Sequence, residues 1–184
     1  VMAQSRVATR YATALFQEAQ QKGALETVMG DIRGLKTMLK DSRDFALFVT
    51  SPIIKASQKQ IAIKALSART DFAPLTNNFL ALLVEKSRIA ELSNILDAFE
   101  VLYNGVNNIL PVEVTSAIEL DAAQKESLLK KLEAQTGKKP QPTYLVNPTL
   151  IGGFTVKIGD SMMDSSIKHQ LSLLKKRLLE GALN

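Results

Sequence analysis

Residues 147–160 read Asn-Pro-Thr-Leu-Ile-Gly-Gly-Phe-Thr-Val-Lys-Ile-Gly-Asp, and this stretch decides how the second half of the chain folds. Phe154, Val156 and Ile158 alternate with polar residues, which is the period of a half-buried β-strand. Gly159 and Asp160 follow as a turn signal. The stretch therefore predicts a strand that ends in a tight turn.

Gly152 and Gly153 directly precede this strand. A phosphate-binding glycine loop precedes a helix and carries Lys-Ser or Lys-Thr, and neither feature is found at this pair. We therefore expect a bulge or a close approach of two backbone segments. Asp160 and Asp164 could ligate a cation, but turn and capping roles are the favoured interpretation.

Two further segments of the second half predict strands. Val112 and Val114 alternate with polar neighbours, and residues 144–146 form a short run of strand-forming type. Pro140 and Pro142 interrupt the alternation before that run, which puts the local strand geometry in doubt.

Helices complete the second half. Asp121 and Gln124 can cap a helix that ends at Gly137 and carries Leu128, Leu129 and Leu132. Ser165 can cap a final helix, whose apolar residues have heptad-like spacing: Ile167, Leu171, Leu174 and Leu178. Residues 107–184 are therefore predicted to form a small α+β domain.

Residues 1–106 instead repeat apolar positions at helical spacing. The first helix follows Ser5, ends at Gly23 and has the stripe Ala8, Ala12, Leu15, Phe16 and Ala19. Five further helices follow. The second helix spans Leu25–Leu39, and the third begins after a cap at Asp41-Ser42. A capping box at Ser57 and Gln60 opens the fourth, Pro74 lies in the first turn of the fifth, and an apolar stripe from Ile89 to Val106 marks the sixth. The predicted fold class is α+β, with a six-helix N-terminal bundle before the smaller domain.

Two of these helices carry more apolar surface than one core-facing stripe needs. Val7, Tyr11 and Ala14 form a second strip on the first helix, and residues 79–84 are six apolar residues in succession. Such a helix is either central in its bundle or shared with a partner, and the residues alone leave both interpretations open.

Composition restricts the chemistry. The 184 residues include no cysteine, which excludes disulfides and the common cysteine zinc sites. His169 is the one histidine, so acid–base catalysis of the usual kind is not expected. No apolar run approaches the roughly 18 residues that span a bilayer. The net charge of +5 is spread among 18 acidic residues, which favours a solvated surface over a nucleic-acid site. We therefore expect neither catalysis nor a bound cofactor or metal.

Two segments resemble the ATP synthase delta and oligomycin-sensitivity-conferral protein family. They are Arg10-Tyr11-Ala12-Thr13-Ala14-Leu15-Phe16 and the stretch 147–160, continued by Asp164, Ser166, Ile167 and Leu171. The second segment is the more specific, and the likeness extends in order and spacing over the whole chain. Ser165 departs from the pattern, because a Gly is common there.

The resemblance implies a non-catalytic stator subunit of a rotary proton-translocating ATP synthase, with one copy in each complex. Domain 1–106 would grip the N-terminal helix of an alpha subunit of the catalytic head, and domain 107–184 would hold the b-type subunits of the peripheral stalk. The complex would lie on the cytoplasmic face of a bacterial inner membrane or, alternatively, on the matrix face of the mitochondrial inner membrane.

Site residues follow from this resemblance. The alpha-subunit helix would lie in a groove between the first and fifth helices, lined by Val7, Tyr11, Ala14, Leu15, Phe79, Leu82 and Leu83. The stalk would contact Phe154, Val156, Ile167, Leu171 and Leu174. The stretch 147–160 with its continuation through Asp164 is here called the signature, and its remaining residues are predicted to be structural: Gly152, Gly153, Gly159, Asp160 and Asp164. For the final helix, packing of its seam on the domain's own strands stays an equal alternative.

Two rival functions make different predictions. A nucleic-acid-binding adaptor would lose affinity steeply with salt. An enzyme with a phosphate site near Gly152 would bind or hydrolyse nucleotides.

Overall fold

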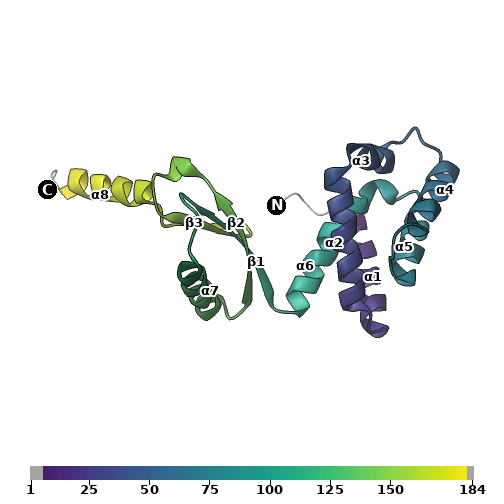
Figure 1. Cartoon of the computed structure of the whole chain (residues 1–184), viewed down its shortest axis with the longest axis horizontal. Helices are drawn as coiled ribbons and strands as arrows, with labels where there is room; N and C mark the ends of the chain where they lie inside the picture. The colour runs from purple at the N-terminus through teal and green to yellow at the C-terminus, as the bar shows by residue number, and fades with distance from the viewer. Residues whose placement is uncertain (1–5, 182–184) are drawn as a thin grey trace. The chain divides into compact units, whose positions relative to one another are not determined.

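The computed structural model describes residues 6–181, with side chains to residue 175. The chain is α+β, as predicted (Figure 1). It divides into two compact units, Val1–Tyr103 and Asn104–Asn184. The division lies in the last turn of helix α6 (Leu92–Val106), slightly before the expected boundary between residues 106 and 107.

The first unit is helical. Besides α6 it contains α1 (Arg6–Gln21), α2 (Leu25–Asp41), α3 (Arg43–Thr50), α4 (Ala56–Ser67), α5 (Pro74–Glu85) and the short 3-10 helix η1 (Ile89–Glu91). The buried stripe of α1 is the predicted one: Ala8, Ala12, Leu15, Phe16 and Ala19. The rings of Phe16 and Phe99 meet edge to face with centroids 5.7 Å apart, so α1 and α6 share the core.

The capping box expected at Ser57 and Gln60 is wrong. Helix α4 begins at Ala56, two residues earlier than a cap at Ser57 would place it, and Lys55 at its N-cap makes no side-chain capping bond. A tertiary contact sets its inward face, because buried Lys59 donates from Nζ to the carbonyl oxygen of Val49 at 2.7 Å, near the C-terminal end of α3. Burial lowers the pKa of Lys59.

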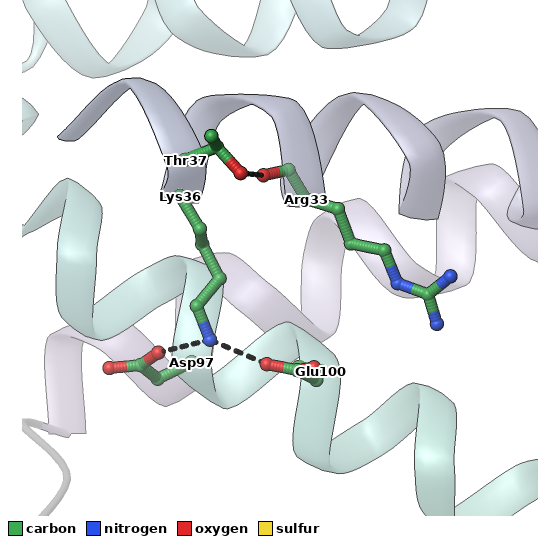
Figure 2. Close-up of polar contacts among 5 residues, drawn as sticks. All are labelled: Arg33, Lys36, Thr37, Asp97 and Glu100. Atoms are coloured by element: carbon green, nitrogen blue, oxygen red, sulfur yellow. Dashed lines mark hydrogen bonds and ion pairs between the residues drawn. The ribbon is translucent and has the colours of Figure 1, made fainter. Parts of the chain in front are cut away.

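Lys36 ties α2 to α6. Figure 2 shows its ammonium group between the carboxylates of Asp97 and Glu100, with Nζ 2.7 Å from Asp97 Oδ1. Burial alone would lower the pKa of Lys36, but the hydrogen bonds to the two carboxylates outweigh it and raise that pKa. A second bond between these helices joins the Tyr103 hydroxyl, which donates to the Glu26 carboxylate at 2.8 Å.

The second unit is built on a four-stranded sheet in the order β2-β1-β3-β4. Its strands are β1 (Ile109–Ser116), β2 (Lys139–Val146), β3 (Phe154–Ile158) and β4 (Ser161–Asp164). Helix α7 (Ala122–Thr136) connects the parallel pair β1 and β2 and packs on the sheet (Figure 1). Its predicted caps are confirmed, since Asp121 and Gln124 form a capping box and Gly137 is left-handed. The core contains Val112, Val114, Leu128, Leu132 and Val156.

Strand β2 contains both prolines that had put its geometry in doubt. It is an edge strand, and the N–H groups of Lys139 and Asn147 donate to carbonyls at both ends of β1. N–H groups alternate in direction along a strand, so the even positions Pro140 and Pro142 face away from β1. The missing donors therefore cost no ladder bond, and they make the free edge a poor template for another strand.

The signature segment joins the sheet to helix α8 (Ile167–Gly181). Gly153 has a φ of +81°, and a Cβ there would lie 2.5 Å from the carbonyl oxygen of Ser165, which is the close backbone approach that we predicted. Ser166 rather than Ser165 caps α8, because its Oγ accepts from the N–H of His169 at 3.2 Å. Ser165 instead donates its N–H to Phe154, as part of the strand pairing.

At the aspartate end of the signature the predicted turn is confirmed, whereas Asp164 ends β4 and is not the cap of a helix. Gly159 has a φ of +56° in the turn between β3 and β4. Asp164 Oδ1 accepts the N–H of Ser166 at 2.9 Å, and the hydrogen bonds from Ser166 lower the pKa of Asp164. The carboxylate thus helps to start α8.

Candidate partner-binding groove

A groove of about 670 Å³ lies between α1 and α5. Apolar residues from one face of each helix form its two walls. Polar and charged residues lie between these apolar residues and past them along the groove. The lining consists of Val7, Arg10, Tyr11, Ala14, Leu15, Glu18, Lys22, Leu75, Asn78, Phe79, Leu82 and Arg88. The second apolar strip of α1, which the core does not use, thus forms one wall.

Six of the seven residues predicted for this groove line it, and Leu83 does not. Leu83 is 0% exposed and belongs to the core, whereas Leu82 is 40% exposed. Successive helical residues point about 100° apart, so Leu82 and Leu83 face different sides of α5, and Phe79 lies between these two directions, about 60° from Leu82 and about 40° from Leu83. The prediction for Leu83 is therefore corrected: it supports the wall from inside.

The run of six apolar residues in α5, residues 79–84, contributes both to the core of the bundle and to an open surface, the two roles that the sequence left open. Leu80, Leu83 and Val84 are buried in the helical unit. Phe79 and Leu82 face the groove, and Ala81 is exposed outside the lining. The helix is thus partly core and partly open surface.

The first turn of α5 is held by α2. Asp31 Oδ2 accepts the N–H of Ala73 at 2.9 Å and the hydroxyl of the buried Thr76 at 2.6 Å. Pro74 occupies the first turn, as predicted, where its missing N–H leaves no bond unmade. These contacts fix which face of α5 points toward α1.

The last turn of α5 ends in a Schellman motif. Ser87 is left-handed with a φ of +56°, its N–H donates to Val84 at 3.0 Å, and the N–H of Arg88 donates to Leu83 at 2.7 Å. The chain therefore turns sharply after the helix. This turn places Arg88 at the groove.

Sequence reasoning missed the charged members of the lining: Arg10, Glu18, Lys22 and Arg88. Glu18 pairs with Lys22 at 2.8 Å along α1, so the lining retains an excess of positive charge. The first three residues continue the helical spacing of Val7, Tyr11 and Ala14, and that periodicity is the signal that could have found them.

The residues predicted to contact the stalk separate into three groups. Val156 is 2% exposed in the core of the second unit, so the prediction that it contacts a partner is corrected. Phe154 lines a second groove of about 620 Å³ with Ile118, Leu120 and Leu128 among its neighbours. Ile167, Leu171 and Leu174 are exposed, so this part of α8 does not pack its seam on the unit's strands.

The described residues show two further properties that bear on function. Within residues 6–181, no group of three or more His, Cys, Asp or Glu side chains is placed to hold a metal ion. Over the same residues, none of the helices has the length and apolar character required to cross a membrane.

Fold and groove define a class: a two-unit α+β protein whose helical unit has an apolar groove between its first and fifth helices. A model of the family described as ATP synthase delta (OSCP) subunit matches residues 7–178. The chain therefore belongs to the ATP synthase delta (OSCP) subunit family.

Individual relatives agree with this assignment. ATP synthase subunit delta of Desulforamulus reducens is 38% identical over 179 residues, which cover 97% of this chain and 98% of that protein. Its counterpart in Fuscovulum blasticum is 37% identical over 174 residues, which cover 95% and 94%. Among solved structures, a chain of the Toxoplasma gondii mitochondrial ATP synthase matches 95% of this chain with a TM-score of 0.75 and 29% identity, over 98% of its own length.

Proposed function

We propose that this chain is the non-catalytic stator subunit that links the alpha subunits of the catalytic head to the b-type peripheral stalk of a rotary ATP synthase. Rotor torque then drives ATP synthesis instead of turning the whole head. The first unit holds the N-terminal helix of an alpha subunit, and the second unit holds the stalk. The groove between α1 and α5 is the observation that carries the proposal.

The groove suits an amphipathic helix. Such a partner is recognised by apolar anchors at i, i+3, i+4 and i+7 that lie in an apolar trough. Tyr11 and Leu15 supply one wall, Phe79 and Leu82 supply the other, and small Ala14 allows close approach. The positive excess of the lining favours a partner with acidic residues beside its anchors.

Apolar anchors also suit the mechanical role. A stator contact must outlast each power stroke, so slow dissociation matters more than fast association. Anchors in a buried trough act mainly on the dissociation rate, whereas charges at the rim act mainly on the association rate.

The proposed location is the cytoplasmic face of a bacterial inner membrane, in a peripheral complex. The relatives in Desulforamulus reducens and Fuscovulum blasticum support the bacterial alternative. The mitochondrial matrix face is the alternative, because the structural neighbour from Toxoplasma gondii belongs to a mitochondrial ATP synthase.

Calorimetric titration with a synthetic peptide of the alpha subunit's N-terminal helix tests the proposal. We expect the wild-type chain to bind, and Leu82→Asp to weaken binding about thirtyfold or more, because it places a charge among the anchors. Ala81→Asp is the matched control, since Ala81 is exposed on the same helix but outside the groove lining. No binding by the wild type, or equal loss in both variants, would contradict the proposal.

A further inference from the structure

Exposed apolar residues gather at one end of the sheet in the second unit. Strands β1 and β2 end there, β3 begins there, and α8 starts beside them. Three backbone hydrogen bonds join the segments at this end. The N–H groups of Asn147, Ala117 and Ile167 donate to the carbonyl oxygens of Ser116 at 2.8 Å, Gly153 at 3.2 Å and Gly152 at 3.0 Å, respectively. The exposed members, here called the apolar end, are Ile118, Val146, Ile151 and Ile167.

Ile151 has the most unusual conformation in this group. Its φ of 62° and ψ of −40°, with the N–H of Gly152 donating to Leu150 at 2.6 Å, define a γ-turn of the rare, strained kind. Positive φ is an outlier for a β-branched residue. The side chain is nevertheless 75% exposed, so core packing does not explain why an isoleucine occupies this turn.

The surrounding segment keeps the strained turn in place. Asn147 Oδ1 accepts from the N–H and hydroxyl of Thr149 at 3.1 Å and 2.7 Å, and Gly153 is pressed against Ser165 on the other side. Strain that is held by its surroundings and carried by an exposed side chain points to a role at a surface.

The surface continues along α8. Leu171 and Leu174 follow Ile167 at i+4 and i+7 and are exposed, which makes an apolar seam of about two turns. Lys168 and Lys175, seven residues apart, lie along one flank of this seam, and residues 165–175 contain no acidic residue. A helix that covered the seam would meet positive charge on that flank.

We propose that the apolar end and the seam of α8 form one docking surface for a single amphipathic helix with acidic residues along one flank, and that Ile151 is an anchor of this surface. The inference rests on the proposed function, because it takes the occupant to be a helix of the peripheral stalk. It adds the apolar end to the contacts already predicted on α8, together with the chemistry of the occupant and the role of the strained residue.

Binding of the soluble segment of the b-type stalk subunit to the full chain tests the anchor. Ile151→Gly relieves the strain and removes the side chain, so we expect unchanged or higher thermal stability together with about tenfold or more weaker binding. Ile53→Gly is the matched control, because Ile53 is also a highly exposed isoleucine and lies between α3 and α4 of the other unit. It should leave stalk binding unchanged.

The charge pattern is tested with two double variants of equal net charge. Lys168→Glu with Lys175→Glu should weaken binding about tenfold at low salt, with the difference shrinking as salt rises. Lys138→Glu with Lys139→Glu changes two exposed lysines at the opposite end of the sheet and should have little effect.

The outcomes distinguish a failure of the proposed function from a failure of this inference. If the wild-type chain does not bind the stalk segment, the proposed function itself fails. If the wild type binds but Ile151→Gly binds equally tightly, or both double variants weaken binding equally, this inference is wrong while the proposed function stands.

Discussion

Gly153 and Ser87 both adopt positive φ, but the surroundings demand glycine at only one of them. At Gly153 a Cβ would collide with backbone atoms of Ser165 and Ser166, which cannot move away as a side chain would. At Ser87 the left-handed conformation completes the Schellman motif after α5, and a serine occupies a position where glycine is usually preferred. The two residues therefore respond to substitution in opposite ways.

Gly153→Ala should destabilise the second unit by about 2 kcal/mol or more, through the backbone clash and the positive φ. Gly30→Ala is the control, because Gly30 lies within α2 with nothing within 4 Å of an added Cβ, and it should stabilise by about 0.5–1 kcal/mol. Urea unfolding and hydrogen exchange of the β3 amides measure both effects. Equal stability of the two alanine variants would contradict the close approach.

Ser87→Gly should stabilise the first unit by about 0.5 kcal/mol, since relief of the left-handed strain exceeds the added freedom of the unfolded chain. Asn108→Gly is a suitable comparison, because Asn108 has a φ of 52° but asparagine tolerates this region. The urea midpoint should rise for Ser87→Gly and change less for Asn108→Gly. A lower midpoint for Ser87→Gly would show that the serine has another role there.

Residue types alone could not decide between inward and outward positions in two places. Leu82 and Leu83 have the same side chain in an unbroken apolar run, and the contacts of Asp31 with the start of α5 decide which of them faces the groove. Val156 shares the alternation of its strand with Phe154, yet α7 covers it more completely. Where a stripe was unambiguous, as on α1, the predicted face is confirmed.

At the scale of elements, α2 organises the helical unit through polar contacts. Lys36 joins it to α6, and Asp31 joins it to the start of α5. Each contact can be removed without opening a large cavity. Their contributions can therefore be measured separately.

Lys36→Met should destabilise by about 0.5–1 kcal/mol near neutral pH, a modest value because the pair is partly exposed. The raised pKa of Lys36 means that the folded state holds this proton more tightly than the unfolded state. The stabilisation is therefore complete below the ordinary lysine pKa of about 10.5 and is lost as pH rises through the folded value. Urea unfolding at several pH values should show the difference between wild type and variant shrinking above that pH. A difference that grows there would contradict the assignment.

Asp31→Ala should cost about 1–3 kcal/mol, because it leaves the N–H of Ala73 and the hydroxyl of buried Thr76 without their acceptor. The first turn of α5 should then fray and show faster hydrogen exchange. Binding of the alpha-subunit peptide should weaken as well, although Asp31 does not line the groove. Unchanged exchange in α5 would show that the helix start is held by other contacts.

Local signals predicted elements well where the relevant bonds are local. The capping box at Asp121 and Gln124, the cap at Ser42 and Pro74 in a first turn are of this kind. The expected box at Ser57 failed because Lys59 reaches the end of α3, and the cap of α8 moved from Ser165 to Ser166 because strand pairing engages Ser165. Long-range contacts of this type leave no mark in a short window of sequence.

At the scale of the whole molecule, the division into a helical unit and an α+β unit was predictable, because the apolar period changes between the two halves. The use of each unit was not predictable from periodicity, which describes interiors better than surfaces. Family membership supplied the expected partners, and the exposure of Leu82 and Ile151 indicates where each unit has apolar surface that its own core does not use.

Thiol protection tests most directly whether a partner helix covers the groove between α1 and α5. The chain has no cysteine, so Leu82→Cys and Ala81→Cys each introduce a single thiol. The rate of alkylation is measured with and without the peptide of the alpha subunit's N-terminal helix. Our account predicts that the peptide slows alkylation at position 82 at least about tenfold, as expected for a site closed to solvent, and leaves position 81 unchanged. Equal alkylation at position 82 with and without saturating peptide would contradict it.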